Sequence, residues 1–369
     1  MQHPDVHPAS LEEKMEEIGA STSALGKQYL DSLRKEKVET PVLFDRDVTG
    51  NSLLDNVHAL IEELRAQGER PETISAIVEE FLERKFEPGS ATQDQHGTCA
   101  AESAKFLFSY HNPGEWARVL RELICFGEST VAGGAVIRVP RDLGKRDRSA
   151  AREYTDAVAQ AALMNLAAYE GEEYSNKRDG FTRNKGLQKQ RFEGGLTTEQ
   201  SQYVFEQLTG RAYTGIEDKN TLIALVKRYG HYLPVALEWE GEGAHQVVVT
   251  RYDEKTSRVY FRNPHGPDFG PDVVDGATER QNPPRRVEQG DIGEESMTIE
   301  DFREHVLSAE LPQEDLLAFK QGVNVDGPRV EFGESRTEKN DPAVAGNISA
   351  FRTRLGGIDG FRSDSAFAA

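Results

Sequence analysis

Cys99 is the residue whose type and position most clearly suggest chemistry. It follows a polar, glycine-containing turn, residues 93–98, and opens an apolar segment, residues 100–110, that we expect to be helical. A thiol at a helix N-terminus lies at the positive end of the helix dipole, which stabilises its thiolate. The other cysteine, Cys125, lies in the apolar run 120–126, a setting typical of a buried core thiol. The sequence therefore predicts that Cys99 is a nucleophile.

His245 is the candidate base for this thiol. It stands between a glycine-rich turn and the valine-rich segment 246–250, so we expect a strand to hold its ring at the mouth of a cleft. There it could take the thiol proton and form a thiolate–imidazolium pair. Such a pair predicts a pH–rate profile bounded by a lowered thiol pKa and a raised imidazole pKa.

Asn263 is the candidate third member of a triad. It ends the next predicted strand, residues 258–262, and antiparallel pairing brings the end of that strand near the start of the histidine strand. An amide oxygen at this point would accept a hydrogen bond from the imidazole N–H and fix its tautomer. Asp253 could be mistaken for a triad acid, but it is better interpreted as part of the turn between the two strands.

Gln93 is the candidate oxyanion donor, because it lies on the turn before the cysteine. Its side-chain NH2 group and the backbone N–H of Cys99 would together stabilise the developing oxyanion. Gln95 and His96 are alternatives on the same turn, although both are more typical of loop residues. His265 is expected either to stack over the triad or to lie in a surface turn.

These motifs resemble the papain-like cysteine peptidases, over residues 92–311. The order and spacing of Gln93 and Cys99, an Ala-His pair before a valine-rich strand, and the run Asn263-Pro264-His265-Gly266 are similar to that family's pattern. The resemblance implies a two-lobed fold, with a helical lobe carrying the cysteine and an antiparallel β lobe carrying the histidine and asparagine. It is nearest in style to the papain-like domains of bacterial effectors and toxins.

The chain departs from that family at two positions. Ala100 stands where an aromatic residue normally follows the nucleophile, and His265 stands where a tryptophan shields the Asn–His bond. The resemblance implies a thiol protease that cleaves a peptide or isopeptide bond. Two alternatives stay open: a glutamine deamidase or transglutaminase-like acyltransferase that uses the same triad, and an adaptor with a vestigial triad.

The elements that would position these residues form an α+β pattern, with helices first and antiparallel strands second. Periodic apolar residues, caps and turn residues mark them out. Helices are expected over residues 1–40, 52–67, from 71 onward, from 113 onward, 150–169, 198–210, 220–229 and 298–307; strands over 132–139, 231–240, 245–252 and 258–262; and long loops over 170–195 and 268–295.

Three regions are expected along the chain: a helical leader, residues 1–88; a catalytic domain, residues 89–326; and a mostly disordered tail, residues 327–369. The leader is either a pro-segment that is cleaved near residues 87–90 or a set of helices that simply pack on the catalytic domain. The basic stretch 176–191 is expected to be a solvated surface, with recruitment of an acidic partner as the alternative.

Composition limits the partners. The 369 residues include 44 Lys and Arg against 63 Asp and Glu, so the formal net charge is −19, which disfavours binding to nucleic acid. No apolar run is long enough to span a membrane, and the first residues do not look like a cleaved signal peptide. We expect a protein or peptide substrate, with an inhibitor or chaperone as a further conceivable partner, and neither metal nor cofactor. The chain would be cytoplasmic, or exported by a dedicated secretion system.

Overall fold

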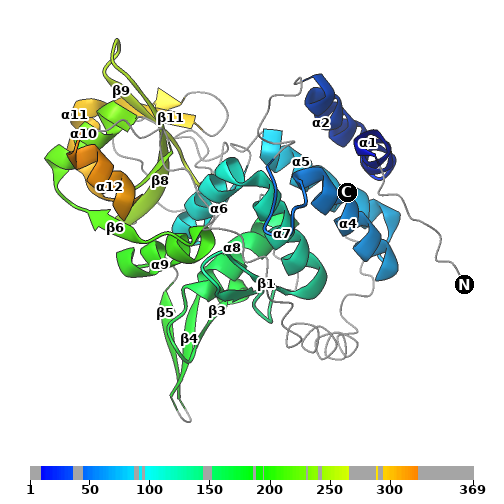
Figure 1. Cartoon of the computed structure of the whole chain (residues 1–369). Coiled ribbons are helices and arrows are strands. Elements are labelled where there is room, and N and C mark those ends of the chain that lie inside the picture. The colour runs from blue at the N-terminus through cyan, green and yellow to red at the C-terminus, as the bar shows by residue number, and fades with distance from the viewer. Residues whose placement is uncertain are drawn as a thin grey trace, which may run out of the picture.

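The computed structural model combines helices with antiparallel sheet (Figure 1). It describes residues 10–35, 45–86, 91–93, 96–143, 152–185, 188–193, 195–229, 232–239, 243–265, 288–289 and 294–322. Gln95, the break at residues 87–90 and the tail at residues 327–369 lie outside these ranges. None of the helices in the described ranges is long and apolar enough to cross a membrane.

Four N-terminal helices come first: α1 (Leu11–Ala20), α2 (Ala24–Lys35), α4 (Leu53–Ala66) and α5 (Pro71–Phe86). Helix α4 begins where the sequence predicts, because Ser52 forms a capping box with Asp55. Apolar residues of these helices belong to one continuous core with residues of α6, α7 and α8. Of the predicted leader, α4 packs on α7 and α5 packs on α8, and α7 and α8 in turn pack on the helix that carries the cysteine.

The central helices are α6 (Cys99–His111), α7 (Pro113–Phe126), α8 (Tyr154–Leu166) and α9 (Thr198–Thr209). Helix α8 is shorter at both ends than predicted. Helix α9 has the predicted capping box of Thr197 with Gln200, and it ends at Gly210 with φ +70°, a left-handed conformation that glycine adopts without strain. Helix α6 lies in the middle of the molecule, between the helices and the sheet (Figure 1).

A seven-stranded sheet forms the other part, with strand order β10-β11-β9-β8-β7-β12-β6 and antiparallel pairing between all neighbours. The sequence predicts its central strands, but it misses four others because their pairing partners are distant in the chain or their residues are polar. The strands are β6 (Tyr213–Ile216), β7 (Leu233–Trp239), β8 (Gly243–Asp253), β9 (Arg258–Arg262), β10 (Glu288–Gln289), β11 (Glu294–Thr298) and β12 (Val306–Pro312).

Three helices cover one face of this sheet: α10 (Lys219–Tyr229), α11 (Ile299–His305) and α12 (Gln313–Lys320). Residues of α10, α11 and the sheet form a second core, which includes Leu222, Val247 and Phe302. Helix α6 packs against the sheet from the other side, through β8. The sheet thus has a structural face under α10 and α11 and a face turned towards the cysteine helix.

The prediction of an exposed loop over residues 170–195 is wrong. This region forms a three-stranded antiparallel sheet of β3 (Glu172–Ser175), β4 (Gly180–Lys185) and β5 (Gln188–Glu193), with a short 3-10 helix at Asn176–Arg178, and it projects from the helical body (Figure 1). Tyr174 and Phe181 are buried and pack edge to face, which anchors the sheet. The many cations obscure this pattern in the sequence.

Two further loop and strand predictions need correction. The strand predicted over residues 132–139 is shorter, β2 (Val136–Arg138), and it pairs with an unpredicted strand, β1 (Glu128–Thr130). The loop predicted over residues 268–295 contains β10 and the start of β11. Its short strands are rich in charged residues, so they lack the apolar alternation that marks a strand.

Candidate active site

Cys99 is the first residue of α6 and is partly exposed. The next two side chains, Ala100 and Ala101, are buried, whereas Cys99 itself is partly exposed. Thr98 occupies the N-cap position but makes no capping hydrogen bond with its side chain. Cys99 is thus at the positive end of the dipole of α6, which is the setting that favours a thiolate.

His245 lies near the start of β8, opposite Leu237 of β7. Its ring lies between two aromatic neighbours: Trp239 at 4.8 Å and His265 at 4.4 Å, the latter nearly parallel at 9°. Only 2% of the residue is exposed. Of the two outcomes predicted for His265, the structure has the stacked one. The His265 ring lies against the ring of His245, and His265 is the residue that stands where the papain-like pattern has a tryptophan.

Asn263 follows β9 and lies beside this ring. The distance between His245 Nε2 and Asn263 Oδ1 is 2.9 Å, a hydrogen bond that leaves Nδ1 as the ring nitrogen able to take a proton from a thiol. The pairing of β8 with β9 produces this contact, as the sequence predicts, with a register shift between Val249 and Arg251. Asp253 lies in the turn at the far end of these strands, where its carboxylate accepts from Lys255 N and Thr256 Oγ1.

Several hydrogen bonds fasten the cysteine helix and the turn before it to this corner of the sheet. Ser103, one helical turn after Cys99 on the same face of α6, donates from Oγ to the backbone oxygen of Gln246 at 3.4 Å. The backbone N–H of Gln93 donates to the oxygen of Pro264 at 2.7 Å. Thr92 Oγ1 donates to the oxygen of His265 at 2.6 Å. These contacts connect both sides of the cysteine to the residues that flank His245 and Asn263.

Gln93 is therefore adjacent to the triad candidates, and it is 3% exposed. Its side-chain oxygen, Oε1, has no hydrogen-bond partner in the described part of the protein. A buried amide left partly unsatisfied is unusual and calls for an explanation. An oxyanion only accepts hydrogen bonds, so it would meet the NH2 group of Gln93, and the unsatisfied oxygen is not itself support for the predicted oxyanion role. His96, the described alternative on this turn, donates its backbone N–H to the oxygen of Gln93 at 3.2 Å.

The electrostatics of His245 differ from the expectation. Burial lowers its pKa well below the ordinary value, electrostatic repulsion between the two rings of His245 and His265 lowers it further, and the hydrogen bond to Asn263 opposes both effects. We expected a raised imidazole pKa. The prediction assumed a thiolate partner but ignored the desolvation of a ring that two aromatic side chains enclose. A lowered pKa keeps the ring neutral, and a neutral ring can accept a proton.

The turn that carries Gln93 is held from behind by α8. Gln160 accepts from Thr98 Oγ1 at 2.9 Å, and its NH2 group donates to the oxygen of Thr92 at 3.0 Å and to Glu102 Oε2 at 2.6 Å. Asp179, in the turn between β3 and β4, accepts from the N–H of Gly97 at 2.7 Å. The unpredicted three-stranded sheet thus supports the loop that precedes the nucleophile.

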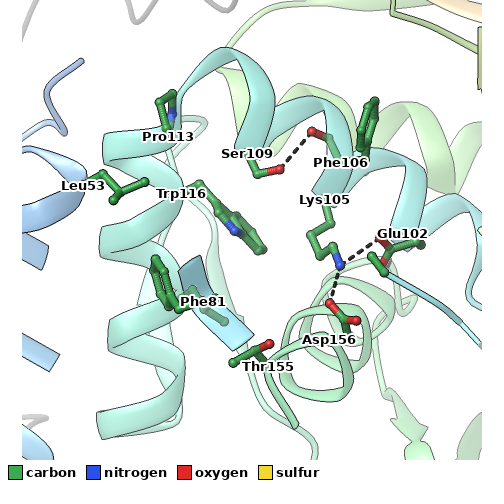
Figure 2. Close-up of a pocket in the computed structure, with 12 residues that line it drawn as sticks. Leu53, Phe81, Glu102, Lys105, Phe106, Ser109, Pro113, Trp116, Thr155 and Asp156 are labelled. Carbon is green, nitrogen blue, oxygen red and sulfur yellow. Dashed lines mark hydrogen bonds and ion pairs between the residues drawn. The ribbon is translucent and has the colours of Figure 1, made fainter. Parts of the chain in front are cut away.

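A small cavity lies behind α6, and the charged residues that line it anchor the helix (Figure 2). Its volume of about 30 Å³ would hold one water molecule and no substrate. Lys105 points towards Asp156 of α8 and Glu102 of α6, and it forms ion pairs with both (Figure 2). All three are almost completely buried, so losing one partner would leave a buried charge uncompensated. This cluster is an anchor for the cysteine helix.

Glu295, Gln160, Asp179 and Trp239 contact the candidate site but were not among the predicted site residues. Glu295 accepts a hydrogen bond from Asn263 Nδ2 at 2.8 Å and is 7% exposed. No local pattern marks Gln160 or Glu295, because each meets its partner only after folding. Within the described ranges, no group of three or more His, Cys, Asp or Glu side chains could hold a metal ion. No family model matches this chain, and a search of curated proteins also finds no match.

Proposed function

We propose that the chain is a papain-like cysteine hydrolase that cleaves a peptide or isopeptide bond in a protein substrate. The observation that carries the proposal is the hydrogen bond between His245 and Asn263, at the sheet corner to which the Cys99 helix is fastened. In this proposal the helices around α6 form one lobe and the seven-stranded sheet forms the other. The substrate would lie across the start of α6 and the His245 end of β8.

The proposed reaction starts with the neutral ring of His245. Nδ1 takes the proton of Cys99, and the thiolate attacks the substrate carbonyl carbon. Gln93 and the N–H of Cys99 stabilise the resulting oxyanion. The C–N bond then breaks, and the leaving amine takes the proton from His245. Water, deprotonated by the same ring, hydrolyses the thioester and restores the thiol.

A bacterial effector or toxin is the setting in which we propose this activity, in the cytoplasm or after export by a dedicated secretion system. The departures from digestive relatives support a selective enzyme: Ala100 leaves one wall of the site without an aromatic ring, and His265 stacks on the base instead of a tryptophan.

The test combines a covalent probe with a peptide library. An epoxysuccinyl inhibitor should label the wild type at Cys99 and should fail to label Cys99→Ala, while Cys125→Ala labels normally. Mass spectrometry of a diverse peptide library should then find fragments. Products in which a glutamine side-chain amide has become a carboxylic acid would identify a deamidase instead. The absence of both labelling and products, with a folded protein, would indicate a vestigial triad and overturn the proposal.

A further inference from the structure

Glu295 meets Asn263 on the side of the amide opposite to the histidine. It belongs to β11, where it pairs in register with Phe261 of β9. Its Oε1 atom accepts from Asn263 Nδ2, while its other oxygen, Oε2, has no hydrogen-bond partner among the described residues. The hydrogen bond of this buried carboxyl group is thus made to the Asn263 amide, which lies beside the proposed base, His245. Retaining a buried carboxyl group with one oxygen unsatisfied is costly, so a specific role is a reasonable explanation.

The chemistry of an amide makes this contact directional. A side-chain amide has a donor end and an acceptor end, and either end could face an imidazole ring. A carboxylate can only accept, so the NH2 end of Asn263 must point at Glu295. The backbone N–H of His265 donates to Asn263 Oδ1 at 3.1 Å and favours the same direction. Both contacts turn the amide oxygen towards His245.

The direction of the amide in turn selects the tautomer of His245. An amide oxygen beside Nε2 requires the ring proton to be on Nε2, so Nδ1 carries the lone pair. If the amide were reversed, its NH2 group would face Nε2 and favour the tautomer with the proton on Nδ1. That tautomer could not take a thiol proton at Nδ1.

We infer that Glu295 is a positioning residue that fixes the direction of the Asn263 amide and, through it, the tautomer of His245 with the lone pair on Nδ1. The effect of Glu295 on turnover rests on the proposed function, whereas its effect on the tautomer of His245 does not. The role requires a hydrogen-bond acceptor and does not depend on a full charge. Glu295→Gln keeps a carbonyl oxygen that can accept from Asn263 Nδ2, and the N–H of His265 favours that arrangement over the reversed one, so this variant should keep the wild-type tautomer. Glu295→Leu offers no acceptor and should not keep it.

Glu294 provides a matched control on the same strand. Its carboxylate faces the opposite way and accepts from Thr250 Oγ1 at 2.7 Å and Arg251 at 3.2 Å, contacts that point away from Asn263. It is also buried, at 8% exposed against 7% for Glu295. Replacing Glu294 with leucine therefore removes a similar carboxylate from the same strand without disturbing the direction of the amide.

The experiment measures the tautomer of His245 by nitrogen NMR in the full chain, with ¹⁵N-labelled histidine and His245→Gln for assignment. The wild type, Glu295→Gln and Glu294→Leu should carry the proton on Nε2. Glu295→Leu should shift the ring towards the Nδ1–H form and slow alkylation of Cys99 by about tenfold to a hundredfold, the range that loss of an outer hydrogen-bond partner of a histidine costs in metal sites. Glu295→Ala serves with the same expectation if the leucine variant does not fold.

The outcomes separate the two ideas. A folded Glu295→Leu protein with the wild-type tautomer and alkylation rate would overturn the positioning role, whatever the enzyme does. A shifted tautomer in a protein that cleaves and deamidates nothing would support the positioning role and reject the proposed hydrolase.

Discussion

The two regions that form the candidate site hold their residues in different ways. On the sheet, His245 is almost completely buried between two rings and is aligned by the sequence of contacts from Glu295 through Asn263. On the helix side, Cys99 is partly exposed at the end of α6, and its turn is supported from α8 and from the three-stranded sheet. In the proposed mechanism, the base is therefore aligned by hydrogen-bond direction, and the nucleophile by the position of a loop.

The same contrast appears in the buried acids. Behind α6, Glu102 and Asp156 flank the ammonium group of Lys105. In the sheet, Glu310 and Glu295 each accept from an amide group, Gln246 Nε2 and Asn263 Nδ2. An amide compensates a buried negative charge less well than a cation does. In the sheet, burial accordingly raises the pKa of both Glu310 and Glu295.

The largest effect should come from removing one reacting group from each region. Cys99→Ala and His245→Ala should each lower kcat/KM by about 10⁴-fold or more, because the thiol and its base act as one unit. The double variant should be about as impaired as either single variant. The measurement is hydrolysis of the best peptide from the library, with Cys125→Ala as a fully active control. If the fold-losses of the two single variants multiplied in the double variant, Cys99 and His245 would act independently, which would contradict the shared mechanism.

Asn263→Ala and Gln93→Ala should each lower kcat/KM by about 10²- to 10³-fold, but through different steps. Asn263 acts on the base, so its loss should also slow alkylation of Cys99 by iodoacetamide. Gln93 is proposed to act on an oxyanion, and alkylation forms none, so its loss should leave that rate nearly unchanged. Both rates can be measured on the same preparations. Equal effects of the two variants on alkylation would contradict the division of roles.

Gln160→Leu tests the support of the nucleophile. It removes hydrogen bonds to Thr98, Thr92 and Glu102, and the groups left behind are buried. We expect a loss of about 1–3 kcal/mol in the free energy of unfolding, together with slower alkylation of Cys99. The control is Gln200→Leu on α9, which loses its hydrogen bond to the oxygen of Ala167 and the one that its Oε1 accepts from Thr197 N in the capping box. Gln200→Leu should lower the free energy of unfolding without changing the alkylation rate of Cys99. If both variants slowed alkylation to a similar extent, Gln160 would have no specific role in supporting the cysteine turn.

The change with the smallest expected effect on catalysis concerns the pH dependence of stability in the sheet region. Burial raises the pKa of Glu310 to about 8, above the 4.5 of an ordinary glutamate. Between these values the unfolded chain has lost the proton that the folded chain keeps, so Glu310 costs the fold stability as pH rises, by about 1.4 kcal/mol per pH unit. Glu310→Gln should remove this slope, as measured by urea unfolding at pH 5 to 8. Parallel curves for the variant and the wild type would contradict the raised pKa.

Local chemistry made much of this structure predictable. Ser52 and Thr197 cap helices through short-range contacts, and the helix that begins at Cys99 follows from its apolar sequence. The contact of His245 with Asn263 follows from a hairpin, which is also a local feature. These elements were predicted because their determinants lie within a few residues or within two adjacent strands.

The rest depends on contacts between distant segments. Strand β12 pairs with β6 and β7 from far along the chain, and Glu295 reaches Asn263 only because β11 adds to the edge of β9. Gln160 is one of many polar helix residues until α8 packs behind the cysteine turn. The lowered pKa of His245 has the same origin, since Trp239 and His265 enclose the ring only in the folded sheet.

The most direct test of the triad compares the two cysteines of one protein. Cys125 is buried, and burial raises the pKa of its thiol, so it is an internal reference for an unactivated sulfur. At neutral pH, mass spectrometry should locate iodoacetamide on Cys99 and not on Cys125 in the wild type. His245→Ala should strongly slow the alkylation of Cys99, while Cys125 stays unlabelled because it is buried. Alkylation of Cys99 at the same rate with and without His245 would contradict the account.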